Sequence, residues 1–145
     1  MYKHILIATD GSELAQKAVG QGLALARALD AKVLAITVTE PWASVVSGEM
    51  TFAFPVDEYE KNAAANASTI LASATDIARK VGVTCETLHV KDRYPADGIV
   101  ETAKAHGCDL IIMASHGRRG VSRMLLGSEA NKVVALSTMP VLICR

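Results

Sequence analysis

Asp109-Leu-Ile-Ile-Met113 runs directly into Ala114-Ser-His-Gly117, and this stretch decides the fold that the sequence predicts. A short apolar run that ends at small residues and a glycine is typical of a buried strand followed by a turn. After nine intervening residues, Gly127-Ser128 precedes a segment with helical spacing. The stretch therefore predicts a strand, a loop and a helix in succession, as in a parallel β-α-β arrangement.

The loop and the start of this helix form a candidate anion site. The first turn of a helix presents unpaired N–H groups and the positive end of the helix dipole, which favour a bound phosphate. Gly127 lets the backbone approach an anion closely because it has no side chain, and Ser128 adds a hydroxyl group. The loop itself carries positive charge at Arg118, Arg119 and Arg123. This combination suits the phosphates of a nucleotide, although glycines also occur at turns and helix starts that bind no ligand.

Outward from this unit, apolar runs and segments with helical spacing alternate along the chain. Strands are predicted at residues 5–8, 33–38, 84–90, 110–113 and 141–144, and helices from Ser12 to about 29, over 56–81, from Pro95 to Gly107 and over 128–136. Fully apolar strands that alternate with helices predict an α/β fold, with one parallel sheet covered on both faces. Right-handed crossovers make such a sheet doubly wound.

The connection between residues 39 and 55 is longer than usual and contains Trp42, Phe52 and Phe54. Connections of this length often serve as lids or contact surfaces. We expect the three aromatic rings to pack against protein rather than to stack on a ligand.

The composition predicts one folded domain with no general affinity for polyanions. The 145 residues, half of them hydrophobic, suffice for a single domain, 1–145, with a sizeable core. Fifteen Lys and Arg residues balance fifteen Asp and Glu residues, so neither nucleic acid nor a membrane is an expected partner. No signal peptide, bilayer-spanning run or cysteine metal pattern is visible, which predicts a soluble cytoplasmic protein.

The glycine spacing near the C-terminus resembles that of the universal stress protein family. The nucleotide-binding branch of that family carries Gly-x2-Gly-x9-Gly-Ser/Thr after its fourth strand. Here the segment from Gly117 to Ser128 matches the later positions with the nine-residue spacing intact, and Ala114 replaces the first glycine. The similarity covers nearly the whole chain, including the opening Lys3-His-Ile-Leu-Ile-Ala-Thr-Asp-Gly-Ser12 and the closing Pro140-Val-Leu-Ile-Cys-Arg145.

This resemblance, which is to the A-type members, implies a Rossmann-like fold of the adenine nucleotide alpha hydrolase type, with strand order 3-2-1-4-5. Strands 1 and 4 are then neighbours at the switch point where doubly wound sheets bind ligands, so Asp10 and the glycine loop would face one cleft. The implied ligand is ATP, or else ADP or AMP, with Mg²⁺ as a companion of the phosphates. The implied binding residues are Ala8, Thr9, Asp10, Val38, Met113, Ala114, His116, Gly117, Arg118, Arg119, Arg123, Gly127, Ser128 and Glu129.

The resemblance also implies an assembly and a biological role. In the family's strand order, Val141–Cys144 forms an apolar edge strand, and such edges invite pairing with another chain. The family forms dimers in this way, so a homodimer that serves a stress response is predicted. One departure lies elsewhere: Arg93 stands where the family commonly has glycine, and the turn before Pro95 is expected to differ.

Other interpretations remain open on the sequence alone. Asp10 could simply bond the turn amides ahead of the first helix. His116 has no positioned carboxylate or nucleophile beside it, so a ligand contact is favoured over catalysis, and no catalytic residue or metal ligand is assigned. A family scaffold that binds no nucleotide is the main rival, because Ala114 adds a methyl group to the glycine motif.

A slow ATPase is a further alternative, but the Gly-x4-Gly-Lys-Ser/Thr loop is absent. A phosphoacceptor receiver domain would need an acidic cluster beside Asp10, and a dinucleotide dehydrogenase would need Gly-x-Gly-x-x-Gly after the first strand. The sequence contains neither pattern.

Overall fold

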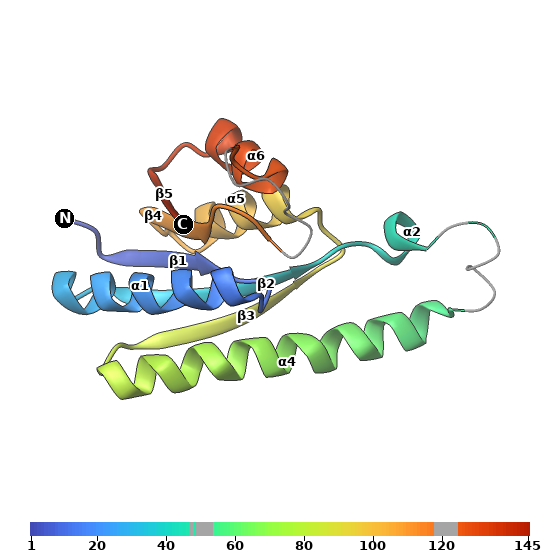
Figure 1. Ribbon diagram of the computed structural model, residues 1–145, viewed down its shortest axis with the longest axis horizontal. Helices are drawn as coiled ribbons and strands as arrows, with labels where there is room; N and C mark the ends of the chain where they lie inside the picture. Colours follow the sequence, from blue (N-terminus) through green and yellow to red (C-terminus); the bar gives the residue numbers. More distant parts are fainter. Residues whose placement is uncertain (47, 49–53, 118–124) are drawn as a thin grey trace.

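The computed structural model describes residues 1–46, 48, 54–117 and 125–145, and it contains one five-stranded parallel sheet (Figure 1). The strands are β1 (His4–Ala8), β2 (Lys32–Thr39), β3 (Cys85–Lys91), β4 (Leu110–Ala114) and β5 (Val141–Cys144). Their order across the sheet is β3-β2-β1-β4-β5, which confirms the predicted doubly wound α/β fold. The predicted strands are all present, with ends that differ by one residue at most.

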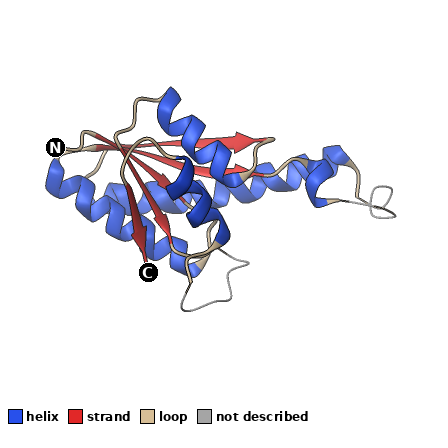
Figure 2. Cartoon of the chain, turned by 90° about the horizontal axis from the view of Figure 1, so that it is seen from above, coloured by secondary structure: helices blue, strands red, loops and turns tan. Residues whose placement is uncertain are grey.

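Helices cover both faces of the sheet (Figure 2). They are α1 (Glu13–Leu29), α2 (Trp42–Val45), α4 (Val56–Val81), α5 (Pro95–Ala105) and α6 (Ser128–Leu136). The ends follow from local chemistry: Ser12 Oγ accepts from the Ala15 amide at the start of α1, and Gly82 ends α4 with a φ of 75°. None of the helices within the described residues combines the length and the apolar character that crossing a bilayer requires.

The core consists of two layers, one on each face of the sheet. Successive strand residues point to opposite faces, so Ile5 and Ile7 of β1 pack beneath α1 and α4, while Leu6 and Ala8 pack beneath α5 and α6. The side chains of Ile5, Leu6 and Ile7 are completely buried, as expected for the central strand of a covered parallel sheet. The same alternation decides which face each residue of the candidate site belongs to.

The connection between β2 and α4 is braced by its aromatic residues. Trp42 Nε1 donates to the Phe54 carbonyl over 2.9 Å, and Tyr59 Oη donates to the Glu40 carbonyl over 2.7 Å. The rings of Phe54 and Tyr59 meet edge to face, with centroids 6.1 Å apart. Trp42 and Phe54 therefore pack within the protein as expected, and Phe52 lies outside the described residues. Together with α2, the N-terminal part of α4 extends beyond the ends of the strands (Figures 1 and 2).

Candidate functional site

The carboxyl ends of β1 and β4 lie side by side, and the segments that follow them meet. The two strands pair in register through Ile7 and Ile112, among others. Beyond the strand ends, Gly117 packs so closely on Asp10 that an added Cβ would lie 2.7 Å from Asp10 Oδ2. A side chain at this position would displace the carboxylate. The structure thus brings together the two segments that the predicted strand order placed at the switch point.

Asp10 helps to hold the turn that leads into α1. Its Oδ1 accepts from the Ser12 amide over 2.9 Å, and the neighbouring Thr9 Oγ1 accepts from the Gly11 amide over 3.2 Å. One carboxylate oxygen of Asp10 therefore has the structural role considered above, which is to accept a hydrogen bond from a turn amide ahead of α1. Its other oxygen faces Gly117, so the same side chain also joins the β1 turn to the β4 loop.

Gly127 closes the loop between β4 and α6 by backbone contact. Its amide donates to the Ser115 carbonyl over 2.8 Å, and an added Cβ would lie 2.7 Å from that same oxygen. The φ of Gly127 is −59°, a value that any residue adopts. Glycine is required here because two backbone segments approach closely. The packing of this loop therefore requires glycine at position 127 whether or not a ligand is bound.

His116 carries a buried nitrogen that has no hydrogen-bond partner among the described residues. Its Nδ1 lies 3.1 Å from Ser115 Oγ, while Nε2 is the one buried side-chain nitrogen or oxygen without a hydrogen bond among the described residues. Buried polar atoms are nearly always paired in folded proteins, so this nitrogen is suited to meet a ligand atom or a water molecule. The Cδ2 of the same ring lies 3.5 Å from the position of an added Cβ at Gly127, so the imidazole adjoins the start of α6.

Ser115 was missed as a site residue by the sequence analysis. It is only 4% exposed, and its amide donates to the Cys144 carbonyl of β5 over 2.7 Å. This bond and the contact with His116 hold Ser115 in place, and the Ser115 carbonyl accepts the hydrogen bond from the Gly127 amide. The sequence carries no signal for the role, because the partners come from β5 and from the start of α6.

The start of α6 has no side-chain cap, in contrast to the start of α1. The N-cap residue is Gly127, and the exposed Ser128 opens the helix. Glu129, which was predicted to contact the ligand, directs its carboxylate elsewhere: Oε2 accepts from the Ala96 amide of α5 over 3.2 Å, and Oε1 pairs with Lys132 over 3.4 Å. A ligand contact at position 129 therefore involves its backbone amide rather than its carboxylate.

Three predicted pocket residues share one face of the sheet. Ala8 and Met113 are each 8% exposed and belong to the core layer beneath α5 and α6, against which the partly buried Val38 also packs. Ala114 belongs to the opposite layer, beneath α1, where its methyl group is buried. The methyl group that raised doubt about the glycine motif thus points into the core, away from the face that carries Val38.

The arginines predicted to surround the phosphates, Arg118, Arg119 and Arg123, lie outside the described residues. Their role stays a prediction.

A hollow of about 280 Å³ lies between α1 and α4, behind the turn that follows β1. Its lining includes Thr9, Gln16, Asn66 and Ser73, and none of the described residues that line it carries a charge. It opens on the face opposite to Val38. An uncharged lining does not suit phosphates, so the hollow is not the predicted site.

Comparison with known proteins places the chain among stress proteins. A model of the universal stress protein family matches residues 1–145. The universal stress protein YxiE of Bacillus subtilis is 33% identical over 100% of both chains. The solved structure of the hypothetical protein MJ0577, from Methanocaldococcus jannaschii, has a TM-score of 0.84 at 28% identity and covers 99% of this chain and 96% of that one. A universal stress protein solved in complex with cAMP has a TM-score of 0.71 at 27% identity, with 99% and 97% covered.

Proposed function

The chain belongs to the universal stress protein family, and on this premise we propose that it is a stress-response binding module whose ligand is an adenine nucleotide. The observation that carries the proposal is the buried His116 Nε2, which has no hydrogen-bond partner among the described residues and lies beside Gly127, at a helix start without a side-chain cap. The structural neighbour that holds cAMP supports the class of ligand, since it is similar to this chain over nearly its whole length.

The residues present fit such a ligand at both of its ends. At the phosphate end, the first-turn amides of α6, the hydroxyl of Ser128 and His116 Nε2 would donate to phosphate oxygens. At the base end, Val38 would offer an apolar surface, and Ala8 and Met113 lie on the same face of the sheet. In this proposal ATP, ADP or AMP spans the two ends.

The remaining groups have distinct tasks in this proposal. Asp10 would accept from a ribose hydroxyl, and Mg²⁺ would bind through the phosphates. Because the net charge of the chain is zero, attraction for the phosphates has to be local. The side chains of Arg118, Arg119 and Arg123 would supply this local positive charge.

We further propose a homodimer that pairs through β5. This strand lies at the edge of the sheet, and Leu142 on it is 41% exposed. On α6, Val134 and Leu136 expose 49% and 50% of their surface. An apolar edge of this kind favours pairing with a second copy, which buries both strands at once.

Isothermal titration calorimetry with ATP, ADP and AMP in the presence of Mg²⁺ tests the nucleotide proposal. The wild-type chain should release or absorb heat with at least one of them. His116→Phe should weaken binding by about tenfold, because a hydrogen bond to a charged phosphate is lost. The matched control is His106→Phe, since His106 is an exposed histidine at the end of α5 whose Nδ1 lies 3.0 Å from the Thr102 carbonyl oxygen of the same helix.

Two results would count against the proposal. If the wild-type chain produces no binding heat with any of the three nucleotides, the scaffold interpretation replaces it. If His116→Phe and His106→Phe bind as tightly as wild type, the nucleotide does not use the unpaired nitrogen.

A further inference from the structure

The turn between β3 and α5 is fastened to the end of β2. Asp92 has a φ of 54°, in the left-handed region, which reverses the chain after β3. The next amide, that of Arg93, donates to the Thr39 carbonyl over 3.5 Å. The backbone of Arg93 therefore lies beside the last residues of β2. The base of the ligand is proposed to lie at this end of β2.

Arg93 and Val38 flank the same glycine of α5. An added Cβ at Gly98 would lie 3.1 Å from Val38 Cγ1 and 3.3 Å from Arg93 Cβ. The absence of a side chain at Gly98 is what allows the two residues to converge there. The stem of Arg93 thus adjoins the apolar side chain on which the base is proposed to rest.

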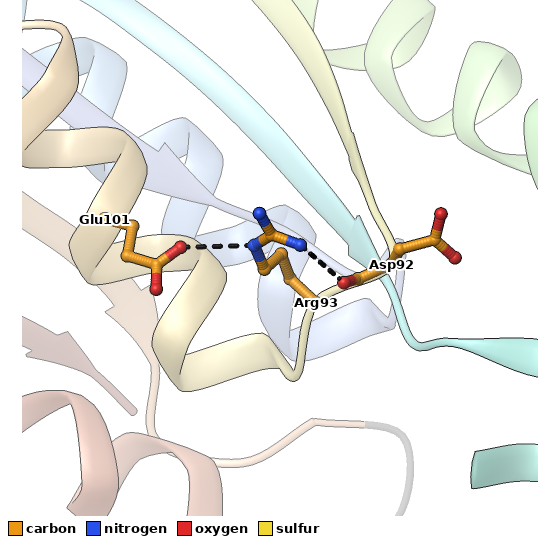
Figure 3. Close-up of polar contacts among 3 residues, drawn as sticks. All are labelled: Asp92, Arg93 and Glu101. Carbon is orange, nitrogen blue, oxygen red and sulfur yellow. Dashed lines mark hydrogen bonds and ion pairs between the residues drawn. The ribbon is translucent and has the colours of Figure 1, made fainter. Parts of the chain in front are cut away.

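The guanidinium group of Arg93 is held in place at two points (Figure 3). Its Nε donates to Glu101 Oε2 over 3.2 Å, and its Nη1 donates to the Asp92 carbonyl over 2.9 Å. No hydrogen bond from Nη2 to any described residue exists, and the side chain remains 55% exposed. A planar guanidinium that is already oriented loses little entropy when it donates further hydrogen bonds or stacks on a ring.

We infer that Arg93 is a base-contacting residue of the proposed nucleotide site, and this inference rests on the proposed function. The guanidinium would donate from Nη2 to a ring nitrogen of the purine and lie against the edge of the ring. The phosphates are proposed to lie at the start of α6, and Glu101 already balances the charge of Arg93. Its contribution to affinity is therefore the same whatever the number of phosphates.

Calorimetry on the full chain with AMP, ADP and ATP tests the inference through the Arg93→Met variant. Methionine keeps an apolar stem but removes the donors, so affinity should fall by about 3- to 30-fold, by the same factor for all three nucleotides. Arg93→Lys should lose less, because it keeps the charge without the planar group. The matched control is Arg79→Met on α4, where an exposed arginine pairs with Asp76 over 3.3 Å, and no loss is expected.

A second measurement separates a ligand contact from a structural role. The ion pair with Glu101 is exposed, so Arg93→Met should leave the Tm of the nucleotide-free chain nearly unchanged. If affinity falls only together with Tm, Arg93 is a structural residue.

Three results of the titration would overturn the inference. Equal binding by wild type and Arg93→Met removes the assignment of Arg93 but leaves the proposed function intact. A loss that grows from AMP to ATP places Arg93 at the phosphates instead. A wild-type chain that binds none of the three nucleotides overturns the proposed function, and the inference with it.

Discussion

Replacing Gly127 by alanine should destabilise the fold, although the backbone conformation at this position suits any residue. The added methyl carbon would lie 2.7 Å from the Ser115 carbonyl oxygen, whereas ordinary contacts of this type lie at 3.4–4 Å. The carbonyl cannot move aside freely, because it accepts from the Gly127 amide itself and because the Ser115 amide is bonded to Cys144 in β5. Either the start of α6 moves or the bond between Gly127 and Ser115 breaks.

The size of the effect follows from two opposing contributions. Overpacking of a well-packed contact costs about 1–3 kcal/mol. Alanine also restricts the unfolded chain, which stabilises the folded state by about 0.4–1 kcal/mol where the native φ is compatible. The net change in the free energy of unfolding is therefore a loss of about 1–2 kcal/mol, which lowers Tm by about 3–8 °C in a chain of this length.

Thermal unfolding of Gly127→Ala and Gly20→Ala, followed by circular dichroism, measures this difference. Gly20 lies in α1, and an added Cβ there would have no atom within 4 Å. Gly20→Ala should therefore raise stability by about 0.5–1 kcal/mol, the usual gain of alanine over glycine in a helix. If Gly127→Ala unfolds at or above the wild-type temperature while Gly20→Ala behaves as expected, the close backbone approach at Gly127 is not real.

Ser12→Ala should lower the free energy of unfolding by about 1 kcal/mol in a urea titration, since the Ser12 hydroxyl caps α1; an equal loss in Ser68→Ala, at an exposed position of α4, would refute the cap assignment. Burial raises the pKa of the Cys108 thiol from 9.0 to about 11, with a smaller effect from Asp109. Between about pH 9 and 11 the folded state therefore holds the thiol proton that the unfolded state has lost, so stability falls as the pH rises through this window. Cys108→Ala should show a shallower decline of Tm with pH, and an unchanged slope would exclude this cause. Leu142→Arg should convert the proposed dimer to a monomer in analytical ultracentrifugation, whereas Val56→Arg should not; a monomeric wild type would refute the dimer.

Most helices and strands were predictable because their signals are local. The end of α4 at Gly82 and the start of α1 after Ser12 depend on residues that are neighbours in the chain. The short helix α2 was not predicted, because none of its residues is buried and it therefore has no apolar periodicity. The buried direction of Ala114 was available from strand alternation, since it lies two residues after Ile112 and shares its face of the sheet.

The contacts of the candidate site were less predictable, because they join elements that are distant in the sequence. The closeness of Asp10 and Gly117 followed only from the strand order that the family resemblance supplied. Nothing local indicated that Glu129 would accept from the first turn of α5, 33 positions earlier in the chain. Likewise, Nε2 of His89 in β3 lies 2.7 Å from Thr39 Oγ1 at the end of β2, a contact between two residues that are 50 positions apart in the chain. Each of these contacts depends on how two helices or strands pack, which residue spacing does not encode.

The central position of β1 has a consequence for synthesis on the ribosome. One edge of β1 pairs with β2, which follows soon after it in the chain. The other edge pairs with β4, which is synthesised much later. The carboxylate of Asp109, which holds the amides of Lys3 and His4, is made more than 100 residues after them. Nascent chains that end before residue 110 therefore expose an apolar strand edge to the cell, and we expect chaperones to bind them. Translation has to pass three-quarters of the chain before the middle of the sheet can close.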